Sequence, residues 1–131
     1  MEEQKQRIKS QVPQTASGFN RDFKALKKNT DEQIAYLKRI PVETIKKYFQ
    51  KTELETGTFT EIMRTLSEKV SGEEECNWAH AFMDNLSKAF KFDMTIMFAE
   101  DEENEYISNI IGKIRAVDSA KADALEQVFT D

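Results

Sequence analysis

Apolar side chains recur at helical spacing along almost the whole chain, and this periodicity constrains the fold more than any other feature. The clearest stretch is residues 59–70, where apolar residues at i, i+3, i+4, i+7 and i+11 form the pattern of one buried helix face. Convincing alternation of apolar and polar residues is absent, as are Asn-Gly and Asp-Gly hairpin turns. The sequence therefore predicts an all-α fold, a bundle or superhelix of about six to eight short helices.

Turn and capping residues divide the sequence into separate helices. Asp31, Thr58 and Asp93 are short polar residues placed just before apolar stretches, and we expect each of them to cap the start of a helix. Pro41 is expected to end one helix and to occupy the first position of the next, where its missing N–H is not needed. The Ser71-Gly72 pair is expected to end a helix through a left-handed residue.

The inner faces of these helices form the predicted core. Its members are Phe19, Phe23, Leu26, Ile34, Leu37, Ile40, Ile45, Tyr48, Phe49, Phe59, Ile62, Met63, Leu66, Val70, Phe82, Leu86, Phe90, Tyr106, Ile107, Ile110, Ile111, Ile114, Ala122, Leu125, Val128 and Phe129. Trp78 is expected to be a partly buried anchor. Of the two acidic runs, residues 73–75 are predicted to form a loop. Residues 100–103 are predicted to begin a helix, where their negative charges interact favourably with the positive end of the helix dipole.

The first residues differ in composition from the rest of the chain. Residues 1–17 are polar, rich in Gln, Lys and Glu, and contain Pro13, a composition typical of a solvated linker. We therefore predict a flexible polar linker at residues 1–17 and one helical domain at residues 18–131. The chain has 131 residues, which is enough for one domain to bury a core without disulfides.

Charge and cysteine content exclude several classes of function. The net charge is −5, whereas nucleic-acid binding and docking on anionic lipid both favour a basic surface. We therefore expect neither nucleic acid nor membrane as a partner. Cys76 is the only cysteine, so a disulfide framework is excluded and a reducing compartment is expected. The start of the sequence lacks the apolar stretch of a signal peptide, so we expect a cytoplasmic protein, with the nucleus as a second location.

Residues that could carry chemistry are few. The P-loop, the Gly-rich dinucleotide turn and the His-Glu-x-x-His pattern are absent. Cys76 lies four residues before His80 and could form a nucleophile–base pair on a helix, but nothing in the sequence supplies an orienting residue or an oxyanion hole. The acidic runs lack the spacing and the glycine of a calcium loop. We expect no catalytic residue, no cofactor and no metal ion.

The octapeptide Lys-Phe-Asp-Met-Thr-Ile-Met-Phe, which begins at Lys91, carries apolar side chains around most of a short helix. At about 100° per residue, Lys91, Met94 and Phe98 share one side of the helix. Phe92 and Ile96 share another side, which is expected to face the core. A short helix in a small domain is normally apolar on one side only, so the second side is a candidate surface for a partner.

Two interpretations of this octapeptide remain open. All of its apolar side chains could be buried in a core that is rich in Phe. The alternative is a protein-binding surface, which is favoured by the two Met residues, a residue type common on such surfaces, and by Lys91, whose charge could orient a partner.

Several motifs resemble those of a known family over residues 19–114. They are Phe19-x-x-Asp22-Phe23-x-x-Leu26-Lys27, Tyr36-Leu37-Lys38-x-Ile40, Phe59-x-x-Ile62 with Leu66, and Lys91-Phe92-Asp93-Met94-x-x-Met97-Phe98. The last motif is the most specific. The sequence resembles the C-terminal domain of the RNA polymerase II-associated protein 3 family, a module found also in sperm-associated antigen 1 and in a dynein-arm assembly factor.

The resemblance implies a fold, a partner and a site. It implies a helical bundle likened to the ENTH/VHS superhelix, which docks directly on the hexameric RuvB-like AAA+ ATPases. By matching position it implies that Lys91, Met94 and Phe98 contact the ATPase. The family motif often begins with Arg, and Lys91 cannot form the same bidentate pair with a carboxylate.

The resemblance also implies a cellular role. The domain would be a non-catalytic, monomeric adaptor of a heat-shock protein 90 co-chaperone that supports assembly of RNA polymerase II, small nucleolar ribonucleoproteins and kinase complexes. Heat-shock protein 90 and a PIH-domain protein would bind other parts of the parent. One alternative is an axonemal dynein-arm preassembly factor with the same domain. Another is a membrane-trafficking adaptor of the ENTH/VHS type, which rests on likeness of fold alone.

Overall fold

The structure, a computed structural model, describes residues 12–129, and this part of the chain contains eight α-helices. They are α2 (Ala16–Ala25), α3 (Thr30–Arg39), α4 (Val42–Phe49), α5 (Thr56–Lys69), α6 (Gly72–Leu86), α7 (Phe92–Met97), α8 (Asp101–Arg115) and α9 (Ser119–Phe129). The only β-type pairing among these residues is an isolated parallel bridge between Glu53 and Phe90. The predicted all-α fold is confirmed.

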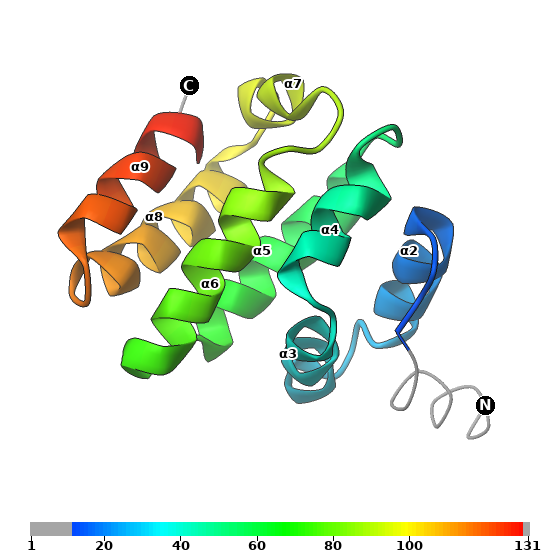
Figure 1. The fold of residues 1–131 in the computed structure, drawn as a ribbon, viewed down its shortest axis with the longest axis horizontal. Coiled ribbons are helices and arrows are strands. Elements are labelled where there is room, and N and C mark those ends of the chain that lie inside the picture. The colour runs from blue at the N-terminus through cyan, green and yellow to red at the C-terminus, as the bar shows by residue number, and fades with distance from the viewer. Residues whose placement is uncertain (1–11, 130–131) are drawn as a thin grey trace.

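Along the long axis of the molecule, α2 lies at one end and α8 and α9 at the other, with α3, α4, α5 and α6 between them (Figure 1). The main packing pairs are α8 with α9, α5 with α8 and α4 with α6. The short helix α7 lies at one edge of this arrangement and connects α6 to α8 (Figure 1). None of the helices in residues 12–129 has the length and apolar character needed to cross a membrane.

The core agrees closely with the predicted set. Its largest fully buried side chains include Phe19, Phe49, Phe59, Phe82 and Phe129. Trp78 and Tyr106 are partly buried against this core, as predicted for Trp78. Two predicted members, Phe90 and Val128, are instead 45% and 44% exposed.

The two errors have different causes. The helix that carries Phe82 and Leu86 ends at Leu86, so Phe90 no longer follows its helical spacing. Phe90 belongs to a connecting segment, where its N–H donates to the Phe49 carbonyl at 2.7 Å. Val128 precedes Phe129 on α9, and the core side of that helix is occupied by Ala122, Leu125 and Phe129.

The predicted N-caps were wrong in three places. Asn29 caps α3 by accepting the Glu32 N–H at 3.1 Å, so the helix begins before Asp31. Thr58 lies inside α5, where it is 1% exposed, because that helix begins at Thr56. Asp93 lies in the first turn of α7, behind the N-cap residue Lys91.

Two helix junctions also differ from the prediction. Pro41 occupies the N-cap of α4 instead of its first helical position. The C-cap of α5 is Val70, in extended conformation, and Gly72 adopts the left-handed φ of 83° only after it. The next helix then begins at once, so the predicted acidic loop, residues 73–75, forms the first turn of α6. The negative charges of this turn are stabilised by the positive end of the helix dipole, as are those at the start of α8.

The first described helix begins inside the predicted linker. Helix α2 begins at Ala16, which is 6% exposed, and Thr15 caps it by accepting the Gly18 N–H at 3.0 Å. The Tyr48 hydroxyl donates to the Pro13 carbonyl, so the chain already contacts the domain at Pro13. Residues 1–11 of the predicted linker lie outside the described residues, and the division at residue 18 stays a prediction.

A buried carboxylate and two tyrosines join α2, α3 and α4. The Tyr36 hydroxyl donates to Asp22 Oδ2 at 3.1 Å, and the Phe19 ring packs against both Tyr36 and Tyr48. Burial, followed by the Asp22 charge, raises the pKa of Tyr36 far above its ordinary value. The same two causes raise the pKa of Tyr48 to about 12.

We expect stability to fall as the pH rises from about 10 to about 12. In that range the unfolded chain loses its tyrosine protons while the folded state retains them, so the unfolded state binds fewer protons and becomes favoured. Each tyrosine contributes at most about 1.4 kcal/mol per pH unit. Urea unfolding at several pH values measures the slope. The Tyr36→Phe and Tyr48→Phe variants should show a flatter profile, and an unchanged slope would contradict this assignment.

Candidate functional site

Helix α7 begins at a residue with unusual backbone geometry. Lys91 has φ 58° and ψ 34°, in the left-handed region that a non-glycine residue occupies at a cost of about 1–2 kcal/mol. Its carbonyl accepts the N–H groups of Met94 and Thr95 at 3.1 and 3.3 Å. The residues on either side of Lys91 differ in burial: Phe90 is 45% exposed and Phe92 only 5% exposed.

One side of α7 packs into the core. Phe92 and Ile96 are 5% and 6% exposed. The Phe92 ring makes edge contacts with the rings of Phe59 and Phe129, at centroid distances of 6.1 and 5.1 Å. It therefore joins α5, α7 and α9. The predicted inward direction of Phe92 and Ile96 is confirmed.

The other side of α7 is exposed and apolar. Met94 is 41%, Met97 57% and Phe98 69% exposed. Lys91 is also exposed, with its Nζ 5.3 Å from the centroid of the Phe90 ring. We call Phe90, Lys91, Met94, Met97 and Phe98 the α7 surface.

The α7 surface concentrates most of the exposed large apolar side chains. Of the seven such residues in the described part of the chain, four belong to it, and the others are Val12, Val117 and Val128. Scattered exposed apolar residues are normal, whereas several of them close together in one segment are typical of interaction sites.

The structure brings the three predicted partner-binding residues, Lys91, Met94 and Phe98, onto this one surface, and their contact with a partner stays a prediction. Phe90 and Met97 were missed. At about 100° per residue, Met97 falls between the two apolar sides, on the far side of the helix, so its exposure could have been inferred from the sequence. Phe90 could not, because its exposure depends on where α6 ends.

A small cavity of ≈ 90 Å³ lies beside Met94 and Phe98. Its walls come from α7, from α5 and the segment before it, and from the start of α8. One of its lining residues, Glu103, is only 5% exposed and accepts a hydrogen bond from Thr60 Oγ1 at 2.9 Å. The exposed apolar side chains therefore adjoin a buried carboxylate.

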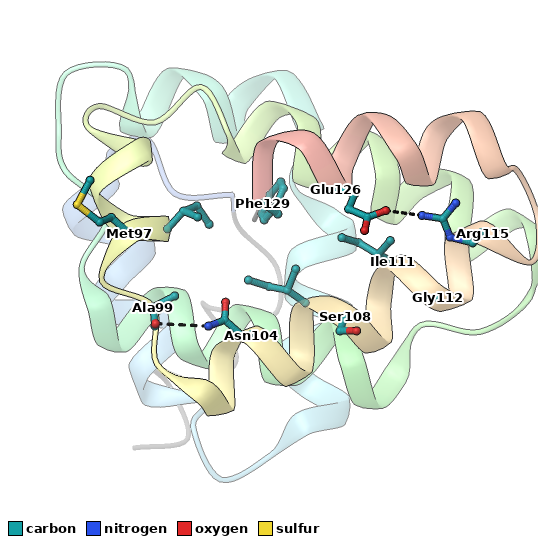
Figure 2. Close-up of a pocket in the computed structure, with 11 residues that line it drawn as sticks. Met97, Ala99, Asn104, Ser108, Ile111, Gly112, Arg115, Glu126 and Phe129 are labelled. Carbon is teal, nitrogen blue, oxygen red and sulfur yellow. Dashed lines mark hydrogen bonds and ion pairs between the residues drawn. The ribbon is translucent and has the colours of Figure 1, made fainter. Parts of the chain in front are cut away.

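A larger groove of ≈ 490 Å³ lies between α7, α8 and α9, as Figure 2 shows. Ile111 and Phe129 line its apolar part, and Met97 lies at its α7 side (Figure 2). At the opposite side, Arg115 is paired with Glu126 at 2.6 Å. The groove has a size usual for small-molecule pockets, and Met97 belongs to both the groove and the α7 surface.

Cys76 lies in an environment that disfavours its reactive form. It is 2% exposed, and its Sγ lies 3.6 Å from the Lys113 carbonyl oxygen. Burial is the main cause that raises the pKa of its thiol, whereas a nucleophilic cysteine requires the thiolate. Within residues 12–129 no three His, Cys, Asp or Glu side chains are grouped as metal ligands would be.

These features define a class of protein: an all-α domain that exposes an apolar surface on a short helix, as protein-binding modules do. Residues 12–104 match the family model described as "Potential Monad-binding region of RPAP3". The chain belongs to this family, the C-terminal domain of RNA polymerase II-associated protein 3. The match includes all residues of the α7 surface and ends within α8.

Individual relatives agree with this assignment. RNA polymerase II-associated protein 3 of Xenopus tropicalis is 34% identical over 98 residues, which cover 73% of this chain and 15% of the relative. The Homo sapiens protein is 29% identical over 94 residues, which cover 72% of this chain and 14% of the relative. The chain thus spans about one seventh of the length of these relatives.

A solved structure shares the fold. The NMR structure of the C-terminal domain of the human RPAP3 protein superposes with a TM-score of 0.82 at 24% identity, covering 92% of this chain and 90% of that one. This likeness agrees with the helical bundle implied by the sequence motifs.

Proposed function

We propose that this domain is a non-catalytic adaptor that docks on the hexameric RuvB-like AAA+ ATPases through the α7 surface. The observation that carries the proposal is the exposure of Met94 and Phe98, 41% and 69%, beside an exposed Lys91. These are the three positions that match the ATPase-contacting motif of the family. A core function for these side chains would require burial, which they do not have.

The mechanism is apolar docking oriented by one charge. Phe98 and Met94 enter a cleft of the ATPase, and full burial of such a side chain contributes about 1.5–3 kcal/mol. Lys91 lies at the edge of this contact, where an opposite charge on the partner sets orientation and association rate more than affinity. Because Phe92 and Ile96 anchor the other side of α7 in the core, the docking side chains are held on a rigid element.

The cellular role follows from the family and concerns the parent protein. The adaptor would link a heat-shock protein 90 co-chaperone to assembly of RNA polymerase II, small nucleolar ribonucleoproteins and kinase complexes. Heat-shock protein 90 and a PIH-domain protein would bind elsewhere in the parent. We place this role in the cytoplasm, with the nucleus as a second location, and propose that the domain itself is monomeric.

Lys91→Glu is the variant that tests the proposal with the least risk to the fold, because Lys91 is exposed. We expect it to abolish co-precipitation of the RuvB-like ATPase pair, because reversing the charge places two like charges opposite each other, which costs far more than losing one rim charge. The melting temperature should barely change. The matched control is Lys28→Glu, an exposed lysine between α2 and α3 with the same change of charge. Normal co-precipitation by Lys91→Glu, or equal loss by both variants, would contradict the proposal.

Monad is a second candidate partner, because the family region that this chain matches is described as a potential Monad-binding region. Competition distinguishes the two partners. If Monad docks on the α7 surface, purified Monad displaces the ATPases from the wild-type domain and fails to bind Phe98→Ala.

The trafficking alternative has its own test, which is flotation with phosphoinositide liposomes. The net charge of −5 leads us to expect no binding to these liposomes.

A further inference from the structure

The cavity beside Met94 and Phe98 combines apolar walls with acidic groups. Its apolar lining includes Leu54, Phe59 and the two exposed side chains of α7, and its acidic lining consists of Glu53 and Glu103. These residues are far apart in the sequence and meet only because α5, α7 and α8 converge here. Its ≈ 90 Å³ is room for about three water molecules, at about 30 Å³ each.

Glu103 is the residue that gives this cavity a chemical preference. It is 5% exposed, and a buried carboxylate is costly unless hydrogen bonds or an opposite charge compensate it. Within the described residues, its one side-chain hydrogen bond comes from Thr60 Oγ1, at 2.9 Å to Oε1. No lysine or arginine forms an ion pair with it in this part of the chain. The carboxylate has four lone-pair sites, so most of its accepting capacity is free for a cation.

The apolar rim matches the rest of a cationic side chain. Lysine and arginine have a hydrocarbon stem that packs on apolar surface and a charged head that seeks a polar group. Here Met94 and Phe98 would contact the stem, Glu103 would accept from the head, and the exposed Glu53 would add a second negative charge.

We propose that this cavity binds a lysine or arginine side chain presented by the protein that docks on the α7 surface. The inference rests on the proposed function in one respect, that a protein docks there. It adds that the partner must carry a basic side chain next to the apolar groups that contact Phe98. Charge complementarity would then run in both directions, with Lys91 facing an acidic group and Glu103 a basic one.

The experiment uses small probes, so that it does not depend on the ATPase. The ¹⁵N-labelled domain is titrated with n-butylammonium, with n-butylguanidinium and with the uncharged n-pentanol, and amide shifts are followed. We expect saturable shifts around Leu54, Thr95 and Glu103 for the cations, with Kd on the order of 1–10 mM for ligands of this size. The cation that binds with the lower Kd indicates whether a lysine or an arginine side chain fits the cavity better. Equal shifts from n-pentanol would overturn the proposal.

Two variants assign the effect to the buried carboxylate. Glu103→Gln keeps an acceptor for Thr60 and removes the charge, and we expect it to weaken cation binding about tenfold, in line with the value of a charged hydrogen bond. Glu105→Gln is the matched control, because it removes an exposed charge from the same helix without lining the cavity. Unchanged binding to Glu103→Gln would overturn the proposal.

The same variants separate this inference from the proposed function. If Phe98→Ala weakens ATPase binding and Glu103→Gln does not, the inference is wrong and the proposed function stands. If Glu103→Gln weakens ATPase binding while its unfolding midpoint in urea equals that of Glu105→Gln, the inference is supported. If Phe98→Ala binds the ATPases normally, the proposed function fails, and the cation titration alone decides on the cavity.

Discussion

The Phe92→Ala variant is expected to lose about 3–5 kcal/mol of unfolding free energy, as buried Phe→Ala replacements typically do. Phe92 is 5% exposed and its ring contacts Phe59 of α5 and Phe129 of α9. The replacement would leave a void where three helices meet. Urea unfolding measures the loss, which would be a large fraction of the 5–15 kcal/mol that small domains typically have.

Phe98→Ala is the matched control for this loss, because it makes the same chemical change six residues later on the same segment. Phe98 is 69% exposed, and surface replacements usually change stability by no more than about 0.5 kcal/mol. A similar loss in both variants would show that the two sides of α7 do not differ as described.

The second large effect is on binding, where Phe98→Ala should weaken the affinity for the RuvB-like ATPases by about 2 kcal/mol or more, close to thirtyfold. The reason is that Phe98, the most exposed of the large apolar side chains in the described residues, would be a central anchor of the docked surface. Titration calorimetry with the purified hexamer measures the change, and thermal melting confirms that the variant is folded.

Two results would remove Phe98 from the interface. One is wild-type affinity, which would make its exposure incidental. The other is unfolding of Phe98→Ala, which would assign this side chain to the core in spite of its exposure. The conservative variant Phe98→Leu keeps most of the apolar volume, so we expect it to retain more affinity than Phe98→Ala.

Helix periodicity predicted the core because burial on one helix face is a property of spacing. The stripe from Phe59 to Val70 is buried as expected, with each of these two residues no more than 1% exposed. Helix ends were predicted less well. Asn29 replaced Asp31 as a cap because several polar residues near a helix start can each accept the first N–H groups, and tertiary packing selects among them.

The two sides of α7 could be predicted for the same reason that the core could. Phe92 and Phe98 are six residues apart, which places them on different sides of any α-helix. Phe90 could not be assigned correctly, because its exposure depends on where α6 ends. The cavity could not be predicted from the sequence either, since Glu53 and Glu103 come to line it only through the packing of α5, α7 and α8.

Hydrogen exchange with and without the RuvB-like hexamer tests the central claim most directly, because it locates the docked surface without any mutation. We predict that binding slows exchange of the backbone amides of residues 90–99. Helix α2, at one end of the long axis, and α3, at the edge opposite α7, should keep their free-state rates (Figure 1). Protection confined to α2 and α3, or a bound complex in which residues 90–99 exchange as in the free domain, would contradict the account.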